Sequence, residues 1–177
     1  MIRTSRTAFA ATVAALLLIA APAAAQLEGG PAIGDAAPKV TTTDLDGRPV
    51  DLGRWLGKGP VFIEFWATWC ESCRALKPRV DSAYAQYHDR VTFLGVDVAF
   101  NETVPGVRAW LAEHRPGFQV LYDSSAAAIR AYEVQATSTV YIIGADGRVA
   151  YAGVGASQEL STALARIVGT DPHSRSH

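Results

Sequence analysis

The spacing of hydrophobic residues predicts strands and helices that alternate along the first half of the chain. The run Val61–Trp66 is β-branched and aromatic without clean alternation, which is typical of a central strand covered on both faces. From about Cys70 to His88, apolar residues recur at three- and four-residue spacing, which predicts a helix. Pro78 lies inside this helix and predicts a kink rather than a break. A second uninterrupted apolar run, Val91–Val98, predicts another buried strand.

The second half of the chain predicts shorter elements and a mixed sheet. Helices are expected at 103–113 with Thr103 as N-cap, from a cap at Asp123 or Ser124 through Ala131, and from a cap at Ser157 to about Gly169. Strands are expected at 118–122, 139–143 and 148–153. Asp-Gly pairs predict two hairpins, one joining Lys39–Thr43 to Pro49–Leu52 and one joining the last two strands. This order predicts a three-layer α/β domain with parallel central strands and an antiparallel edge.

The N-terminal segment has the pattern of a secretory signal peptide and is not expected to be part of the fold. Arg3 and Arg6 precede an apolar run at 9–21, and small residues at 23–25 form an A-x-A cleavage site. The apolar run is shorter than the ~20 residues that span a bilayer, so no membrane anchor is expected after cleavage. We therefore expect a periplasmic or otherwise extracytoplasmic protein, in an oxidising compartment. The expected divisions are a signal peptide at 1–25, a lead-in arm at 26–37, the folded domain at 38–170 and a flexible tail at 171–177.

Composition narrows the classes of function. The chain has 177 residues, which is the length of a single domain. Its content of 49% hydrophobic and 19% charged residues excludes a disordered chain. Sixteen basic against 17 acidic residues give no basic footprint for a nucleic-acid partner. Two cysteines are too few for a structural zinc cage or a dense disulfide network. The cysteines are therefore expected to act as a pair.

That pair lies in the motif Trp69-Cys70-Glu71-Ser72-Cys73, where the first buried strand turns into a helix. Cysteines three residues apart at a helix start lie close to disulfide range. Cys70 faces the unpaired N–H groups and the positive end of the helix dipole, which stabilise a thiolate, so Cys70 is the predicted nucleophile. Cys73, one turn further on, is expected to be the less accessible thiol that resolves the mixed disulfide.

Other uses of two cysteines are possible. A purely structural disulfide is disfavoured because so short a loop removes little entropy from the unfolded chain. Two thiolates can instead hold Cu(I), which makes a metallochaperone the alternative from a different class. The peroxidatic sites of thiol peroxidases have the pattern Pro-x-x-x-Thr-x-x-Cys. This function is disfavoured here because Ile63 occupies the position of the proline when Cys70 is aligned with the cysteine. For the redox reaction no cofactor and no metal are expected.

The segment Phe65–Cys73, with Pro78 five residues later, resembles the active-site strand and helix of the thioredoxin superfamily. Together with Gly34–Pro38, the segment Asp44–Val50 and the predicted signal, it makes the chain most similar to exported TlpA-like and ResA-like thiol-disulfide reductases, over about residues 34–168. The resemblance implies a thioredoxin-like fold with an N-terminal β-hairpin extension and an exposed first cysteine. It also implies electron transfer to partner-protein disulfides, often in cytochrome c maturation or copper-site assembly. Because the dithiol must be regenerated in an oxidising compartment, a membrane electron donor is expected as well.

Two acidic residues extend the resemblance. Glu64 stands six residues before Cys70, at the position that resembles the family's buried acid under the second cysteine. Burial there raises a carboxyl pKa toward neutrality and suits a proton acceptor for Cys73, whereas an edge-facing glutamate would be solvated. Glu71 resembles the acid found between the cysteines of ResA-like proteins. Its charge opposes ionisation of Cys70 and favours a more reducing pair, or it serves only as a favourable first-turn acid.

One position departs from the family pattern. The family places a cis-proline opposite the cysteines, and here Ser138 takes that place within Tyr132–Thr139. A cis bond before a non-proline residue costs ~2.5–4 kcal/mol, so the Thr137–Ser138 bond is predicted to be trans. Ser138 is expected to alter the peptide groove, to offer a hydroxyl or amide to the sulfur and to let a metal approach. The residues expected to shape the site are Trp69, Glu71, Ser72, Thr137 and Ser138.

Overall fold

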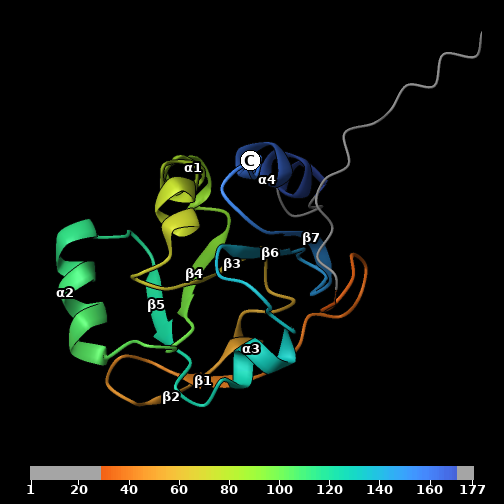
Figure 1. The fold of residues 1–177 in the computed structure, drawn as a ribbon. Coiled ribbons are helices and arrows are strands. Elements are labelled where there is room, and N and C mark those ends of the chain that lie inside the picture. The colour runs from red at the N-terminus through yellow and green to blue at the C-terminus, as the bar shows by residue number, and fades with distance from the viewer. Residues whose placement is uncertain (1–28, 171–177) are drawn as a thin grey trace, which may run out of the picture.

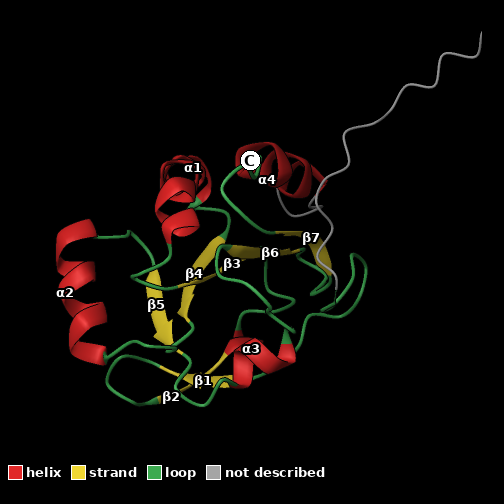
Figure 2. Cartoon of the chain, viewed as in Figure 1, coloured by secondary structure: helices red, strands yellow, loops and turns green. Residues whose placement is uncertain are grey.

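The structure is a computed structural model that describes residues 29–170 (Figure 1). The predicted signal peptide and the tail at 171–177 lie outside the described residues. The strands are β1 Thr41–Thr43, β2 Pro49–Asp51, β3 Val61–Trp66, β4 Thr92–Asp97, β5 Gln119–Tyr122, β6 Thr139–Ile143 and β7 Val149–Gly153. The helices are α1 Glu71–Tyr87, α2 Val104–His114, α3 Ala127–Ala131 and α4 Leu160–Thr170, with a 3₁₀ turn η1 at Leu52–Arg54 (Figure 2).

The strands form one mixed sheet in the order β2-β1-β5-β4-β3-β6-β7. Strand β3 is central and runs parallel to β4, which runs parallel to β5. Strand β6 lies antiparallel to β3 on its other side, and β7 is antiparallel to β6. The predicted parallel centre and antiparallel edge are therefore confirmed. At the other edge, the predicted N-terminal hairpin β1–β2 pairs with β5 at Thr43 and Tyr122.

Helices cover both faces of the sheet, which gives the three predicted layers. Helices α1 and α4 lie side by side over one face, while α3 lies on the opposite side with the β1–β2 hairpin (Figure 1). Alternate residues of β3 point to opposite faces, as a pleated strand requires. Phe62 packs under α1 and α4, and Ile63 packs with the cluster that includes Val107 of α2 and Ala128 of α3.

Helix α1 carries the cysteine motif at its start and is anchored by its apolar side. Its buried residues Cys73, Leu76, Val80 and Ala83 follow the three- and four-residue spacing expected from the sequence. The helix continues through Pro78, so the proline does not break it, while the predicted kink stays a prediction. Because α1 follows directly from the central strand, its first turn is held at the carboxyl end of β3.

Two predicted helix starts are wrong. Helix α3 begins after Ala126, and the carboxylate of Asp123 accepts hydrogen bonds from Ala128 N and Ile129 N from outside the helix. Helix α4 begins at Leu160, so Ser157 is not its cap. Gln158 lies between Ser157 and the start of α4. Its side-chain amide donates to the carbonyl oxygens of Ser138 and Gly155, and these bonds hold the segment before α4 in a turn.

Within residues 29–170, none of the helices combines the length and apolar character needed to cross a bilayer.

Candidate active site

The two cysteines lie where β3 turns into α1. Cys70 is the N-cap residue of α1, with extended backbone angles, and Cys73 lies one turn into the helix. Their Cα atoms are 5.2 Å apart and their sulfur atoms form a disulfide bond. The backbone N–H of Cys73 donates to the Cys70 sulfur at 3.0 Å. The sulfur therefore occupies the place of an N-cap acceptor, where the helix dipole and a free amide favour negative charge.

The expectation of an exposed first cysteine is wrong for this disulfide form. Cys70 is 2% exposed and Cys73 is 6% exposed, so both are buried and Cys73 is not the more enclosed of the two. The reason is the capping geometry, which folds the Cys70 side chain back onto the first turn of α1.

One hydroxyl group contacts the Cys70 sulfur, and a second contacts the first. The Ser72 hydroxyl oxygen is 3.4 Å from the Cys70 sulfur, and the Ser138 hydroxyl is 2.9 Å from that of Ser72. Ser138 also lies within hydrogen-bond distance, 2.5 Å, of the carbonyl oxygen of Thr137. The fold thus brings Ser138, together with its neighbour Thr137, against Ser72 beside the sulfur, and the two serines are 66 residues apart in sequence.

Ser138 is fixed in an unusual backbone conformation. Residues 29–170 contain no cis peptide bond, so the Thr137–Ser138 bond is trans as predicted. Ser138 has a φ of 61°, which is rare for a residue with a side chain. Gly155 N donates to the Ser138 hydroxyl at 3.1 Å, and the Gln158 amide donates to the Ser138 carbonyl at 2.9 Å. Proline cannot adopt this φ, so a proline at 138 would need a different loop.

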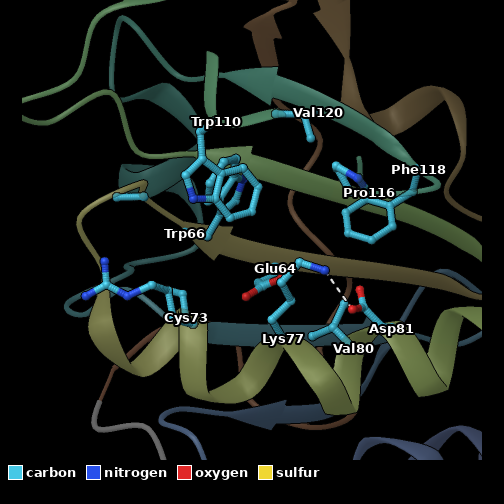
Figure 3. A pocket seen from close by; sticks show the side chains of 12 residues that line it. Glu64, Trp66, Cys73, Lys77, Val80, Asp81, Trp110, Pro116, Phe118 and Val120 are labelled. Atoms are coloured by element: carbon cyan, nitrogen blue, oxygen red, sulfur yellow. Dashed lines mark hydrogen bonds and ion pairs between the residues drawn. The ribbon is translucent and has the colours of Figure 1, made fainter. Parts of the chain in front are cut away.

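Behind Cys73 lies a small cavity that Glu64 of β3 faces (Figure 3). The cavity measures about 30 Å³, and ~10–15 Å³ suffices for a water molecule. Cys73 and Glu64 both line it, and Lys77 and Asp81 of α1 form an ion pair of 2.6 Å beside it. Trp66, Trp110, Pro116, Phe118 and Val120 contribute apolar walls. The cavity therefore combines a thiol position and a carboxyl group in a largely apolar enclosure.

Glu64 is 7% exposed, so it is buried rather than solvated at an edge. Burial raises the pKa of Glu64 to about 8; the negative charge of Asp81 adds to this rise and the positive charge of Lys77 opposes it. A carboxyl group with this pKa exchanges its proton near neutral pH, as a proton acceptor requires.

The turn before Cys70 is held by a residue that the sequence analysis did not single out. The Glu102 carboxylate accepts from Thr68 N at 2.5 Å and from the Thr68 hydroxyl at 3.0 Å. Trp69 is 45% exposed, and its indole N–H donates to the Phe100 carbonyl oxygen at 2.8 Å. The Phe100 ring is 65% exposed and meets Trp69 edge-on. Two aromatic rings therefore stand exposed beside the cysteines.

A second buried acid was also missed. Asp97 ends β4 beside Trp66 and is fully buried; its Oδ1 accepts from Ala99 N at 2.8 Å, while Oδ2 has no partner among the described residues. Burial raises the pKa of Asp97 to about 7, the Ala99 hydrogen bond opposes the rise and Glu102 adds to it. An acid inside an apolar strand run was the signal that also pointed to Glu64.

Two further expectations concern charge and metal near the cysteines. Glu71 is exposed in the first turn of α1, where its charge suits the helix dipole. In the part of the chain that the structure describes, His, Cys, Asp and Glu side chains form no group of three or more that could hold a metal ion.

Comparison with known proteins gives related sequences. The Redoxin family model matches residues 32–167. The thiol-disulfide oxidoreductase ResA of Bacillus thuringiensis subsp. konkukian is 33% identical over 118 residues, which are 66% of this chain and 66% of that protein. ResA of Geobacillus thermodenitrificans is 32% identical over 119 residues, 67% of each chain. The chain therefore matches slightly less than two thirds of the length of the Bacillus relative.

Solved structures give the same fold. A putative thiol:disulfide interchange protein DsbE from Chlorobium tepidum superposes with a TM-score of 0.65 at 26% identity, covering 78% of this chain and 96% of the other. The predicted thioredoxin-like fold and the predicted similarity to ResA-like proteins are thus confirmed. Because the family model spans most of the residues that form the sheet and its helices, the chain belongs to the Redoxin family.

Proposed function

We propose that this chain is a thiol-disulfide oxidoreductase that reduces disulfides of partner proteins outside the cytoplasm. The observation that carries the proposal is the Cys70–Cys73 disulfide at the start of α1, with the Cys70 sulfur as the helix N-cap acceptor. A sulfur at this position is stabilised as a thiolate, which is the attacking species in thiol-disulfide exchange. The ResA relatives support the proposal by their names.

In the first step the reduced chain acts through Cys70. Its thiolate attacks one sulfur of the partner disulfide, an S–S bond forms between Cys70 and the partner, and the partner's other sulfur leaves as a thiolate that takes a proton from solvent. The Cys73 N–H, 3.0 Å from the Cys70 sulfur in the disulfide form, orients the attacking sulfur.

In the second step Cys73 releases the partner. The Cys73 thiol gives its proton to the Glu64 carboxylate across the shared cavity, and the Cys73 sulfur attacks Cys70. The Cys70–Cys73 disulfide forms, and the partner leaves with its second thiol after taking a proton from solvent. Two electrons have passed to the partner, and a dithiol donor at the membrane must return two to the chain.

Partner binding must also open the site. Because both sulfurs are buried, a partner reaches Cys70 only after side chains of the first turn or of the Ser138 loop move aside. The exposed rings of Trp69 and Phe100 offer an apolar contact directly beside this place. We assign them to partner contact.

Trapping the mixed disulfide tests the mechanism. The Cys73→Ser chain lacks the resolving thiol and is expected to accumulate a covalent complex with a protein disulfide such as insulin, whereas Cys70→Ser is expected to form none and to lose reductase activity. The Ser82→Ala chain, changed on an exposed part of α1, is the matched control and should turn over normally. Full activity of Cys70→Ser would exclude the mechanism.

Two further measurements define the direction and the class. A reduction potential near about −270 mV or below for the cysteine pair identifies a reductase, and one near about −120 mV identifies an oxidase. Stoichiometric Cu(I) binding with negligible disulfide turnover would instead support a metallochaperone. Consumption of hydrogen peroxide at rates above disulfide turnover would support a peroxidase.

A further inference from the structure

A pair of hydroxyl groups, brought together from distant parts of the chain, ends at the Cys70 sulfur. Ser72 belongs to the first turn of α1, and Ser138 precedes β6. The Ser72 oxygen is 3.4 Å from the sulfur and 2.9 Å from the Ser138 oxygen. Ser138 is 1% exposed, so the residue is buried.

Each serine has one hydroxyl proton, and this limits the arrangements. In the first arrangement Ser138 donates to the Thr137 carbonyl and Ser72 donates to Ser138. In the second, Ser138 donates to Ser72 and Ser72 donates to the Cys70 sulfur. The disulfide sulfur carries no proton, so Ser72 is the only possible donor in that contact. Gly155 N donates to the Ser138 oxygen in both arrangements.

The charge on sulfur decides between the two arrangements. A disulfide sulfur is a weak acceptor and the 2.5 Å contact to the Thr137 carbonyl is then the better partner for Ser138. A thiolate is a charged acceptor, and hydrogen bonds to charged groups are about twice as strong as neutral ones. Reduction therefore favours the second arrangement.

We propose that Ser72 and Ser138 form a hydroxyl relay that reorients on reduction and stabilises the Cys70 thiolate, with Ser138 acting through Ser72 as a positioning residue. The proposal rests on the function proposed above. The relay carries no proton away, because each hydroxyl only turns, and the proton lost by Cys70 passes to solvent.

The backbone at Ser138 supports a role beyond packing. A φ of 61° is costly for serine, and such strain persists where the surroundings fix it. Here Gly155 and Gln158, from the segment between β7 and α4, hold the Ser138 hydroxyl and carbonyl. These contacts aim the Ser138 hydroxyl at Ser72. A proline or an alanine at position 138 has no hydroxyl to take its place.

The test measures the ionisation of Cys70 alone. In the Cys73→Ser background Cys70 is the only thiol of the chain, and the pH dependence of its alkylation by iodoacetamide gives the midpoint of thiolate formation. Ser72→Ala is expected to raise this midpoint by about one pH unit, a tenfold loss of thiolate at lower pH. Ser72 is half-buried on a helix surface, so this variant is expected to fold. Ser72→Thr should restore the midpoint, and Ser82→Ala should leave it unchanged.

The second variant tests the coupling. Ser138→Gly keeps the left-handed backbone without strain but lacks the hydroxyl, and it should also raise the midpoint. Because Ser138 acts through Ser72, Ser72→Ala/Ser138→Gly should show the same midpoint as Ser72→Ala alone. Additive shifts, or an unchanged midpoint in Ser72→Ala, would overturn the relay.

The two proposals fail in different ways. Alkylation reports on the relay whether or not the chain reduces any partner. If insulin is reduced by the native chain while Ser72→Ala keeps its midpoint, the relay is wrong and the oxidoreductase proposal stands. If no disulfide is reduced while the midpoints shift as expected, the relay stands as a property of the thiolate and the proposed function is wrong.

Discussion

At the scale of single residues, Glu64 has an environment that links the chemistry to pH. Its carboxyl group is buried with a pKa raised to about 8, and it shares a cavity with Cys73. As the pH rises through this value, more chains carry the carboxylate that accepts the Cys73 proton. Glu64→Gln cannot accept this proton, so resolution of a mixed disulfide on Cys70 should slow by about 10²-fold at and above pH 8.

Stopped-flow release of a small thiol from Cys70 measures this step. The deficit of Glu64→Gln should shrink toward lower pH, because the native carboxyl is then protonated and equally unable to accept. Asp97→Asn is the matched control, since Asp97 is also a buried acid with a raised pKa but does not line the cavity. Equal pH profiles for the native chain and Glu64→Gln would remove Glu64 from the mechanism.

Sequence and structure differ most where single residues meet across the fold. The cysteine pair and the burial of Glu64 were predictable because each depends on its own neighbours along one strand and one helix. The Ser72–Ser138 contact was not, because two residues so far apart in sequence meet only through sheet pairing. The burial of Cys70 was mispredicted because capping of α1 turns its side chain inward.

At the scale of elements, Asp123 joins three segments. Its buried carboxylate accepts from the Thr42 hydroxyl of β1 at 3.0 Å, from Ala128 N at 3.2 Å and from Ile129 N at 2.9 Å. Asp123→Ala leaves the two amide donors of α3 without this acceptor, while the Thr42 hydroxyl still has the Tyr122 carbonyl oxygen at 3.2 Å, and the change should lower the free energy of unfolding by about 2–4 kcal/mol. Asp123→Asn retains one carbonyl acceptor and should cost less.

Urea unfolding followed by circular dichroism checks this order. Asp89→Ala changes an exposed acid and should stay within about 0.5 kcal/mol of the native chain. If Asp123→Ala were as stable as Asp89→Ala, the carboxylate would not hold α3 to the sheet.

The contacts of Asp123 and Gln158 explain why the boundaries of the helices were harder to predict than their existence. Helix α1 follows from its hydrophobic period and strand β3 from an unbroken apolar run, because both have long buried stretches. Helix α3 has only five residues, and its start depends on Asp123 bonding across a turn. Helix α4 starts late because Gln158 bonds to the Ser138 loop, a contact with no local signal.

At the scale of the whole molecule, the directions of the strands bring the parts of the site together at one end of the sheet, where β3 and β4 finish. The carboxyl ends of the parallel strands β3 and β4 meet there, and Glu102, which follows β4, accepts hydrogen bonds from Thr68, two residues before Cys70. Strand β6 is antiparallel to β3, so Ser138, which precedes β6, lies at the same end of the sheet as Cys70. Strand β7 ends there too, and Gly155, which follows β7, donates its N–H to the Ser138 hydroxyl. If β6 ran parallel to β3, Ser138 would lie at the opposite end of the sheet from Cys70 and Ser72.

The central strands also contain two buried acids whose raised pKa values should make the stability of the fold depend on pH. The pKa of Glu64 rises from 4.5 to about 8 and that of Asp97 from 3.8 to about 7 on folding, both chiefly through burial. The folded chain therefore binds more protons than the unfolded chain between these values. Stability is then highest below about pH 4 as far as these groups are concerned, and it falls as pH rises.

The fall should reach at most about 1.4 kcal/mol per pH unit for each group, and it should end near pH 7 for Asp97 and near pH 8 for Glu64. Glu64→Gln/Asp97→Asn cannot ionise at either position, so its free energy of unfolding should change less between pH 5 and 8 than that of the native chain. Urea titrations at the two pH values measure the difference, with Asp89→Asn as the exposed-acid control. Parallel losses in the native and doubly substituted chains would show that other groups carry the pH dependence, because only the buried acids differ between them.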